Sequence, residues 1–204
     1  MKRGLVLFAS ATLGLSTVGA TVGAAQTVDE AISELRAGSY ETAIEALEEI
    51  SRSDPGPYLS PNDRRRAYVA YISALAEVGR YEDALEAVSQ APPGIATELA
   101  NTAGEILYEL GQIEGARDEF TRAVRGGAVD RLSARLNLAI IDWTYGDRDA
   151  AFSTFDSFVD VYNGSLPLSA TDLTAVATAV RYLGTREHEL VEDALRAYDE
   201  ALAV

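Results

Sequence analysis

A short pattern that recurs along the chain constrains the fold more than any other feature of the sequence. The pattern is clearest in Gly79-Arg80-Tyr81-Glu82-Asp83-Ala84, which is followed by Leu85 and Val88. Comparable segments begin at four other glycines, namely Gly38, Gly111, Gly146 and, in a looser form, Gly184. The five glycines are 41, 32, 35 and 38 residues apart. A period of this length indicates an array of repeated structural units.

Each position of the pattern has a physical role. Glycine ends a helix because it adopts the left-handed backbone conformation at no steric cost. The small alanine, Ala84 in the example, lets the second helix of a pair approach the first closely. The large residue four positions later, here Val88, lies on the same helix face and fills the space beside the alanine. One such hairpin cannot bury its apolar face alone, so neighbouring hairpins must stack.

The apolar residues recur with helical spacing in every segment and alternate with period two in none. The sequence therefore predicts an all-α fold of ten helices. Proline and glycine breaks such as Asp54-Pro55-Gly56-Pro57 separate the hairpins. Capping signals place three helix starts, at Thr27 with Glu30, at Ser60-Pro61, and at Ser169 with Asp172.

The glycine and alanine segments resemble the tetratricopeptide repeat (TPR) family, whose unit is about 34 residues folded as two antiparallel helices. The resemblance implies a right-handed superhelical α-solenoid of about five antiparallel helix-turn-helix repeats. We expect a repeat domain over residues 26–204, with the following repeats: 27–55, 61–93, 95–127, 129–163 and 169–204. In repeat three, Ala103-Gly104 is expected to mark the close contact between the two helices. In repeat four, Leu138, Ala139, Ile141 and Tyr145 are expected to face the second helix.

Residues 1–25 are typical of a secretory signal peptide. A basic start at Lys2-Arg3 precedes an apolar run from Leu5, and small residues follow up to Ala24 and Ala25. We expect an exported protein, periplasmic or extracellular, with cleavage after Ala24 or Ala25. The alternative is an uncleaved membrane anchor, and only in that case do we expect contact with a membrane. The chain has no cysteine, which excludes a lipid-anchored form, disulfides, thiolate metal sites and cysteine nucleophiles.

Charge and composition restrict the chemistry. The chain has 32 Asp and Glu against 17 Lys and Arg, and such a surface repels nucleic acid. His188 is the only histidine and lies in an acidic turn region, where it suits neither a catalytic triad nor a zinc site. We therefore predict no nucleic-acid binding, no catalytic residue, no metal, no cofactor and no enzymatic activity.

The resemblance to TPR proteins also implies where a partner would bind. In TPR arrays the first helix of each pair lines a concave groove that holds ligand peptides. Positions counted from each glycine give ten candidate groove residues: Arg66, Glu77, Asn101, Glu105, Tyr108, Glu109, Ile140, Trp143, Arg181 and Tyr182. Tyr108, Trp143 and Tyr182 fall at neighbouring places, where they either anchor a partner or merely cover the core.

Two charged groups accompany these residues. Glu98, Glu105 and Glu109 are expected to make one stretch of the groove negative, which suits a partner with Arg or Lys beside apolar residues. The one basic run is Arg64-Arg65-Arg66. We interpret it as a solvated first turn that pairs with nearby acids, in preference to an anion site.

Taken together, the sequence predicts a non-enzymatic protein–protein interaction or scaffold module exported to the cell envelope, which binds a peptide or protein segment in its concave groove. Two alternatives stay open. In the first, the chain is the N-terminal TPR portion of a larger exported protein, whose zinc peptidase-like domain is not in this chain. In the second, it is a structural or oligomerisation spacer. If the chain is not a portion of a larger protein, we expect self-association, in which the exposed end of repeat five pairs with another copy or subunit.

Overall fold

The chain is built from α-helices throughout the part that the structure describes. The computed structural model describes residues 28–52, 60–128, 130–164 and 167–204, and these ranges contain eleven helices and no strand. In chain order the helices are α1 (Val28–Arg36), α2 (Tyr40–Arg52), α3 (Pro61–Glu77), α4 (Tyr81–Gln90), α5 (Pro93–Glu98), α6 (Ala100–Glu109), α7 (Ile113–Gly126), α8 (Arg131–Tyr145), α9 (Arg148–Tyr162), α10 (Ala170–Leu183) and α11 (Leu190–Ala203). The expected signal peptide, Thr27 and the break at Asp54 to Pro57 lie outside the described residues. No helix within these ranges is long and apolar enough to cross a membrane.

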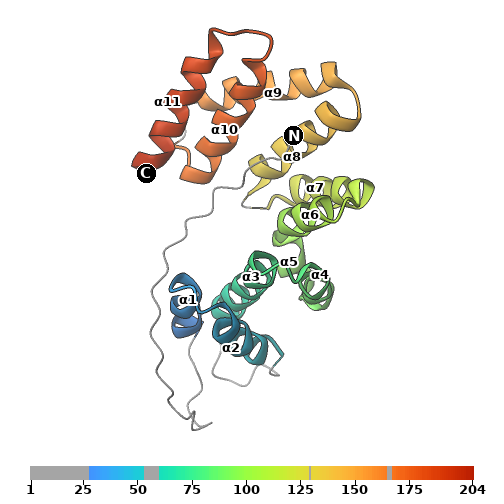
Figure 1. The fold of residues 1–204 in the computed structure, drawn as a ribbon, viewed down its shortest axis with the longest axis vertical. Coiled ribbons are helices and arrows are strands. Elements are labelled where there is room, and N and C mark those ends of the chain that lie inside the picture. The colour runs from blue at the N-terminus through green and yellow to red at the C-terminus, as the bar shows by residue number, and fades with distance from the viewer. Residues whose placement is uncertain (1–27, 53–59, 129, 165–166) are drawn as a thin grey trace.

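The helices form hairpins that stack in series (Figure 1). Within the hairpins, α1 packs on α2, α3 on α4, α6 on α7, α8 on α9 and α10 on α11. Between hairpins, α2 contacts α3, α4 contacts α6, α7 contacts α8 and α9 contacts α10. This consecutive order is that of an α-solenoid, so the predicted fold class is confirmed.

The first helices of the hairpins form the inner layer of the solenoid. Direct contacts join α1 to α3, α6 to α8 and α8 to α10, whereas no comparable set of contacts joins successive second helices in the described ranges. The first helices approach one another more closely than the second helices do in repeats one and two and again in repeats three to five, so the stack curves toward its first helices in both stretches. The faces of α6, α8 and α10 that point away from the second helix of each hairpin therefore line the concave surface.

The repeated pattern works as its residue types predict. The pattern alanines are all fully or almost fully buried: Ala43, Ala84, Ala116, Ala151 and Ala194. The large residues four positions later are buried too in the first four repeats, and Tyr198 is half-buried in the fifth. The capping predictions at Ser60 and Ser169 are also confirmed, because each hydroxyl accepts a bond of 3.1 Å from the amide three residues later.

Two of the five pattern glycines do not have the predicted conformation. Gly38, Gly79 and Gly111 have φ between 74° and 83° and end their helices in the left-handed region, as predicted. Gly146 and Gly184 have φ of −134° and −56°, so the prediction is wrong for them. After Gly184 the chain continues in tight turns, in which the amides of Thr185 and Arg186 bond the carbonyls of Tyr182 and Leu183. A left-handed residue is not needed there.

The first helix of repeat three is divided, which raises the predicted ten helices to the eleven observed in the described ranges. Helix α5 begins at Pro93, where a proline suits the first helical position, and the division falls at Leu99. Leu99 is buried in the core that repeats one and two share. The division lets α5 pack on α7 while α6 contacts α4 and α8.

Helix α11 leaves apolar side chains uncovered. Leu195 and Leu202 are 60% and 87% exposed. Counting from the pattern alanines, they correspond to Phe152 and Val159 of α9, which pack in the core shared with α10. Self-association through repeat five thus has an apolar surface available to it, and it stays a prediction.

The contact at Gly104 provides a test of the packing. A Cβ atom at Gly104 would lie 2.5 Å from the Phe120 ring, so Gly104→Ala should lower the free energy of unfolding by about 1–2 kcal/mol. A Cβ at Gly115 would lie 3.5 Å from Leu107, an ordinary contact. Gly115→Ala should therefore be neutral or raise the same quantity by roughly 0.5 kcal/mol. Urea unfolding followed by circular dichroism measures both, and equal effects would contradict the predicted close contact.

Candidate functional site

The ten candidate groove residues are distributed over four first helices. Helix α3 carries Arg66 and Glu77, and helix α10 carries Arg181 and Tyr182. The remaining six belong to α6 and α8: Asn101, Glu105, Tyr108, Glu109, Ile140 and Trp143. The structure brings together four residues around a cavity and two in an aromatic cluster, and it places the α3 residues apart from both.

A cavity of about 210 Å³ lies between α6 and α8 on the concave surface. Its lining consists of Glu105, Tyr108, Glu109, Phe120, Asn137 and Ile140. Four of these are candidate residues. Phe120, from α7, forms the bottom of the cavity because it is buried against Gly104. The cavity thus combines two carboxylates with aromatic and aliphatic surface.

Two asparagines hold the Glu105 carboxylate in place. The Nδ2 atom of Asn101 donates to Oε1 of Glu105 at 3.0 Å, and Nδ2 of Asn137 donates to the same oxygen at 3.3 Å. The Asn137 amide also donates to Oδ1 of Asn101 at 3.3 Å, which closes the network. Asn101 is only 4% exposed, so α6 and α8 are joined here by a buried polar contact.

The protein around Glu105 makes its charged form unfavourable. Desolvation raises the pKa of the Glu105 carboxyl, the two asparagine hydrogen bonds oppose that shift, and the nearby Asp130 carboxylate adds to it. The residue itself remains exposed to solvent. The two observations agree because a concave surface surrounds a carboxylate with protein atoms and leaves one side open. No ion pair involves Glu105 or Glu109 within the described residues.

The second group is an aromatic cluster between α8, α9 and α10. The Trp143 ring meets the rings of Phe152 and Tyr182 edge to face, with centroids 4.9 and 5.9 Å away. Tyr182 in turn stacks on Phe155 at 4.8 Å. The expected proximity of Trp143 and Tyr182 is confirmed, but both rings are half-buried against the core. They therefore contribute to packing, whatever they contribute to binding.

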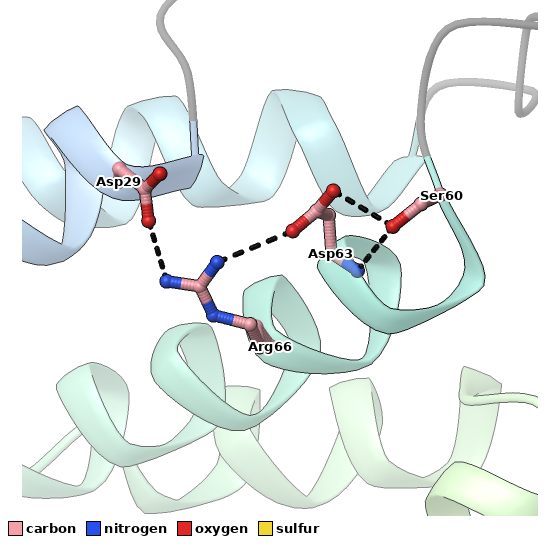
Figure 2. A network of polar contacts seen from close by, with 4 residues as sticks. All are labelled: Asp29, Ser60, Asp63 and Arg66. Atoms are coloured by element: carbon pink, nitrogen blue, oxygen red, sulfur yellow. Dashed lines mark hydrogen bonds and ion pairs between the residues drawn. The ribbon is translucent and has the colours of Figure 1, made fainter.

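Arg66 is engaged within the protein. Figure 2 shows its guanidinium between Asp29 of α1 and Asp63 of α3, at 2.5 and 3.2 Å, and Ser60 next to Asp63. The hydrogen bond to Asp29 is the main reason why the pKa of Arg66 is raised. Arg66 thus joins the first helices of two hairpins. Arg65 likewise pairs with Glu98 at 2.7 Å, which supports our interpretation of the basic run for these two residues.

The remaining candidates contribute less to these groups. Glu77 and Arg181 are both exposed, and the Arg181 guanidinium lies 5.5 Å from the centre of the Tyr182 ring. Within the described residues, no group of three or more His, Asp and Glu side chains is arranged to hold a metal ion.

Comparison with known proteins agrees with this architecture. Residues 28–97 match the family model described as tetratricopeptide repeat. Residues 28–97 are therefore tetratricopeptide repeat sequence. None of the curated protein sequences matches it.

Three solved structures share the fold of this chain over most of its length. BtubC from P. vanneervenii superimposes with a TM-score of 0.64 at 15% identity, covering 87% of this chain and 80% of that one. The TPR-like repeats of a putative kinesin light chain from Podosopora anserina give 0.57 at 16% identity, covering 86% and 93%. A tetratricopeptide repeat protein from Parabacteroides merdae gives 0.54 at 15% identity, covering 86% and 75%. At these identities the likeness concerns the fold alone.

Within the TPR array, sequence reasoning missed or misplaced three residues. Asn137 was not among the candidates, although it lies 36 residues after Asn101, close to one repeat period. Tyr145 was expected to face the second helix of its hairpin, and that prediction is wrong. It is 61% exposed, and its ring lies edge to face with the Tyr108 ring of the preceding repeat, with the ring centroids 6.5 Å apart. The third residue, Phe120, lines the cavity from a second helix.

The Glu105 carboxylate predicts a pH-dependent cost in stability. Its folded-state pKa is raised above the ordinary 4.5, so the proton binds the folded state more tightly. The stability that this gives is present below about pH 4.5 and is lost as the pH rises through the folded-state pKa. Glu105→Gln keeps an acceptor for Asn101 and Asn137 and removes the charge.

We therefore expect Glu105→Gln to unfold at higher urea concentration than the wild type at pH 7, and at the same concentration at pH 4. Asp118→Asn, on an exposed position of α7, is the matched control. A wild type that is the more stable protein at pH 7 would contradict the desolvation of Glu105.

Proposed function

We propose that this protein is an exported, non-enzymatic scaffold that holds a peptide or an extended segment of a partner protein along its concave surface. The TPR fold is that of a protein–protein interaction scaffold. The proposal adds the place of binding, the region around the α6–α8 cavity, and the location outside the cytoplasm.

The cavity between α6 and α8 is the observation that carries the proposal. Several charged groups that join neighbouring helices are paired within the protein, as Arg66 with Asp29 and Arg117 with Asp142 at 2.6 Å. At the cavity, Glu105 keeps its carboxylate in an environment that disfavours its charge. Glu109 lines the same cavity and makes no ion pair within the described residues. Groups that are kept at a cost to stability are candidates for a functional role.

The export part of the proposal depends on residues 1–25. Their basic start, apolar run and small residues have the order of a secretory signal. When the full-length gene is expressed in a bacterial host, we expect the protein in the periplasm or medium. Intact mass should give an N-terminus at Ala25 or Gln26. A cytoplasmic protein that keeps Met1 to Ala24 would contradict export.

The binding part can be tested by capturing partners with variants of the concave and outer surfaces. Tyr108→Ala combined with Glu109→Lys changes the cavity. Tyr40→Ala combined with Asp118→Lys also removes one tyrosine ring and reverses one acidic charge, but at exposed positions of the second helices α2 and α7. Circular dichroism verifies that both double variants melt as the wild type does.

We expect at least one partner from the envelope fraction of the source cells to be recovered about tenfold less with the cavity variant, in quantitative mass spectrometry. This loss is expected because aromatic anchor residues dominate the binding energy of interfaces. Recovery of the same partner should be unchanged with the outer-surface variant. Equal recovery of every partner by both variants would contradict binding at this surface.

A further inference from the structure

The cavity has chemical features that specify what kind of side chain enters it. We propose that the α6–α8 cavity binds an arginine or lysine side chain of the segment held in the groove, with the Glu105 and Glu109 carboxylates as its counter-charges. This inference rests on the groove function proposed above and adds the chemistry of the ligand.

The two carboxylates face the cavity from the same side of one helix. Glu105 and Glu109 are four residues apart on α6, so they lie one above the other on one helix face. Both line the cavity, and both residues are exposed. No arginine of the described chain pairs with either of them. The wall of the cavity is therefore negative and lacks a cation of its own.

The hydrogen bonds around Glu105 leave one of its oxygens open. Asn101 and Asn137 both donate to Oε1. No hydrogen bond to Oε2 is present within the described residues, so this oxygen can accept from a ligand N–H group. The asparagines also fix the direction of the carboxylate, because Asn101 is buried and held from both sides. A pre-oriented acceptor loses little entropy when a ligand binds.

The apolar lining fits the rest of a long basic side chain. Tyr108, Phe120 and Ile140 supply two aromatic rings and an aliphatic group. Arginine and lysine place their methylene stems along such surface while the charged head reaches a polar group. A ring beside the head adds a cation–π attraction. The volume of about 210 Å³ is that of about seven waters, which is enough for one long side chain.

The charges near the cavity favour a cation over other ligands. The Asp130 carboxylate, which raises the pKa of Glu105 by repulsion, adds a third negative charge nearby. One buried oxygen of Asp130 has no hydrogen-bond partner. An anionic side chain in the cavity would be repelled by Glu105 and Glu109, which line it, and by the nearby Asp130. A cationic one would offset the unfavourable charge of Glu105.

A selection of random peptides tests the inference directly. The wild-type protein and a double glutamine variant, which combines Glu105→Gln with Glu109→Gln, are each used to select from a displayed library of random dodecapeptides. The control, Asp118→Asn with Glu187→Gln, removes two exposed charges outside the cavity lining. This control is needed because the acidic chain attracts basic peptides non-specifically. We expect the peptides selected by the wild type and by the control to carry arginine or lysine at one fixed position, beside apolar residues. The peptides selected by the double glutamine variant should show no such position.

A synthetic form of the best selected peptide gives the quantitative test. If the peptide has arginine at the fixed position, citrulline replaces it, which keeps the shape and removes the charge; a lysine is replaced by acetyl-lysine. Fluorescence anisotropy in 150 mM salt should show about tenfold weaker binding of the neutral peptide to the wild type and to the control, the lower end of coupling for close charge pairs. The double glutamine variant should bind the charged and the neutral peptide equally.

The outcomes separate the two proposals. Selected peptides that need Tyr108 but show no basic position, or that bind equally well after neutralisation, would overturn the cationic pocket and leave the groove function in place. If no selected peptide loses affinity when Tyr108 is changed to alanine, the groove function fails, and the inference about the cavity fails with it.

Discussion

The close approach of paired helices at one small residue per hairpin is the contact on which the rest of this structure depends. Ala84 and Ala151 are fully buried at such points, and the residues four positions later, Val88 and Phe155, fill the space beside them. In repeat three Gly104 has a similar role on the first helix, where the Phe120 ring leaves no room for a Cβ atom. Since the chain has no disulfide, this packing must hold each hairpin together.

The same contact decides which surface is available for binding. In repeats three to five the first helices α6, α8 and α10 contact one another, whereas the second helices do not make comparable contacts within the described residues. The faces of these first helices that point away from their second helices therefore form the concave surface. Side chains on this surface do not pack between the two helices of a hairpin. Because the hairpin core does not depend on them, polar residues such as Glu105 and Asn137 are tolerated there.

An acid on a concave surface is in an unusual electrostatic position. Protein atoms surround the Glu105 carboxylate and desolvate it, yet the open side of the groove keeps the residue accessible. On the convex surface the same residue would be fully hydrated and its charge would cost nothing. Curvature thus turns an ordinary glutamate into a group that gains from a cationic partner. The asparagines from two successive hairpins make that effect directional, because they bind only one of its oxygens.

The sequence by itself determined the helical class, the stacking of hairpins and the burial of the pattern alanines, because these follow from periodicity and local steric rules within each repeat. It also placed Glu105, Tyr108, Glu109 and Ile140 on one surface, since repeat register fixes the helix face. Only the tertiary structure decided that Leu99 divides a helix, that Arg66 is already paired with Asp29, and that Asn137 and Phe120 complete the cavity. Those features depend on the distance and angle between neighbouring hairpins, which no local pattern encodes.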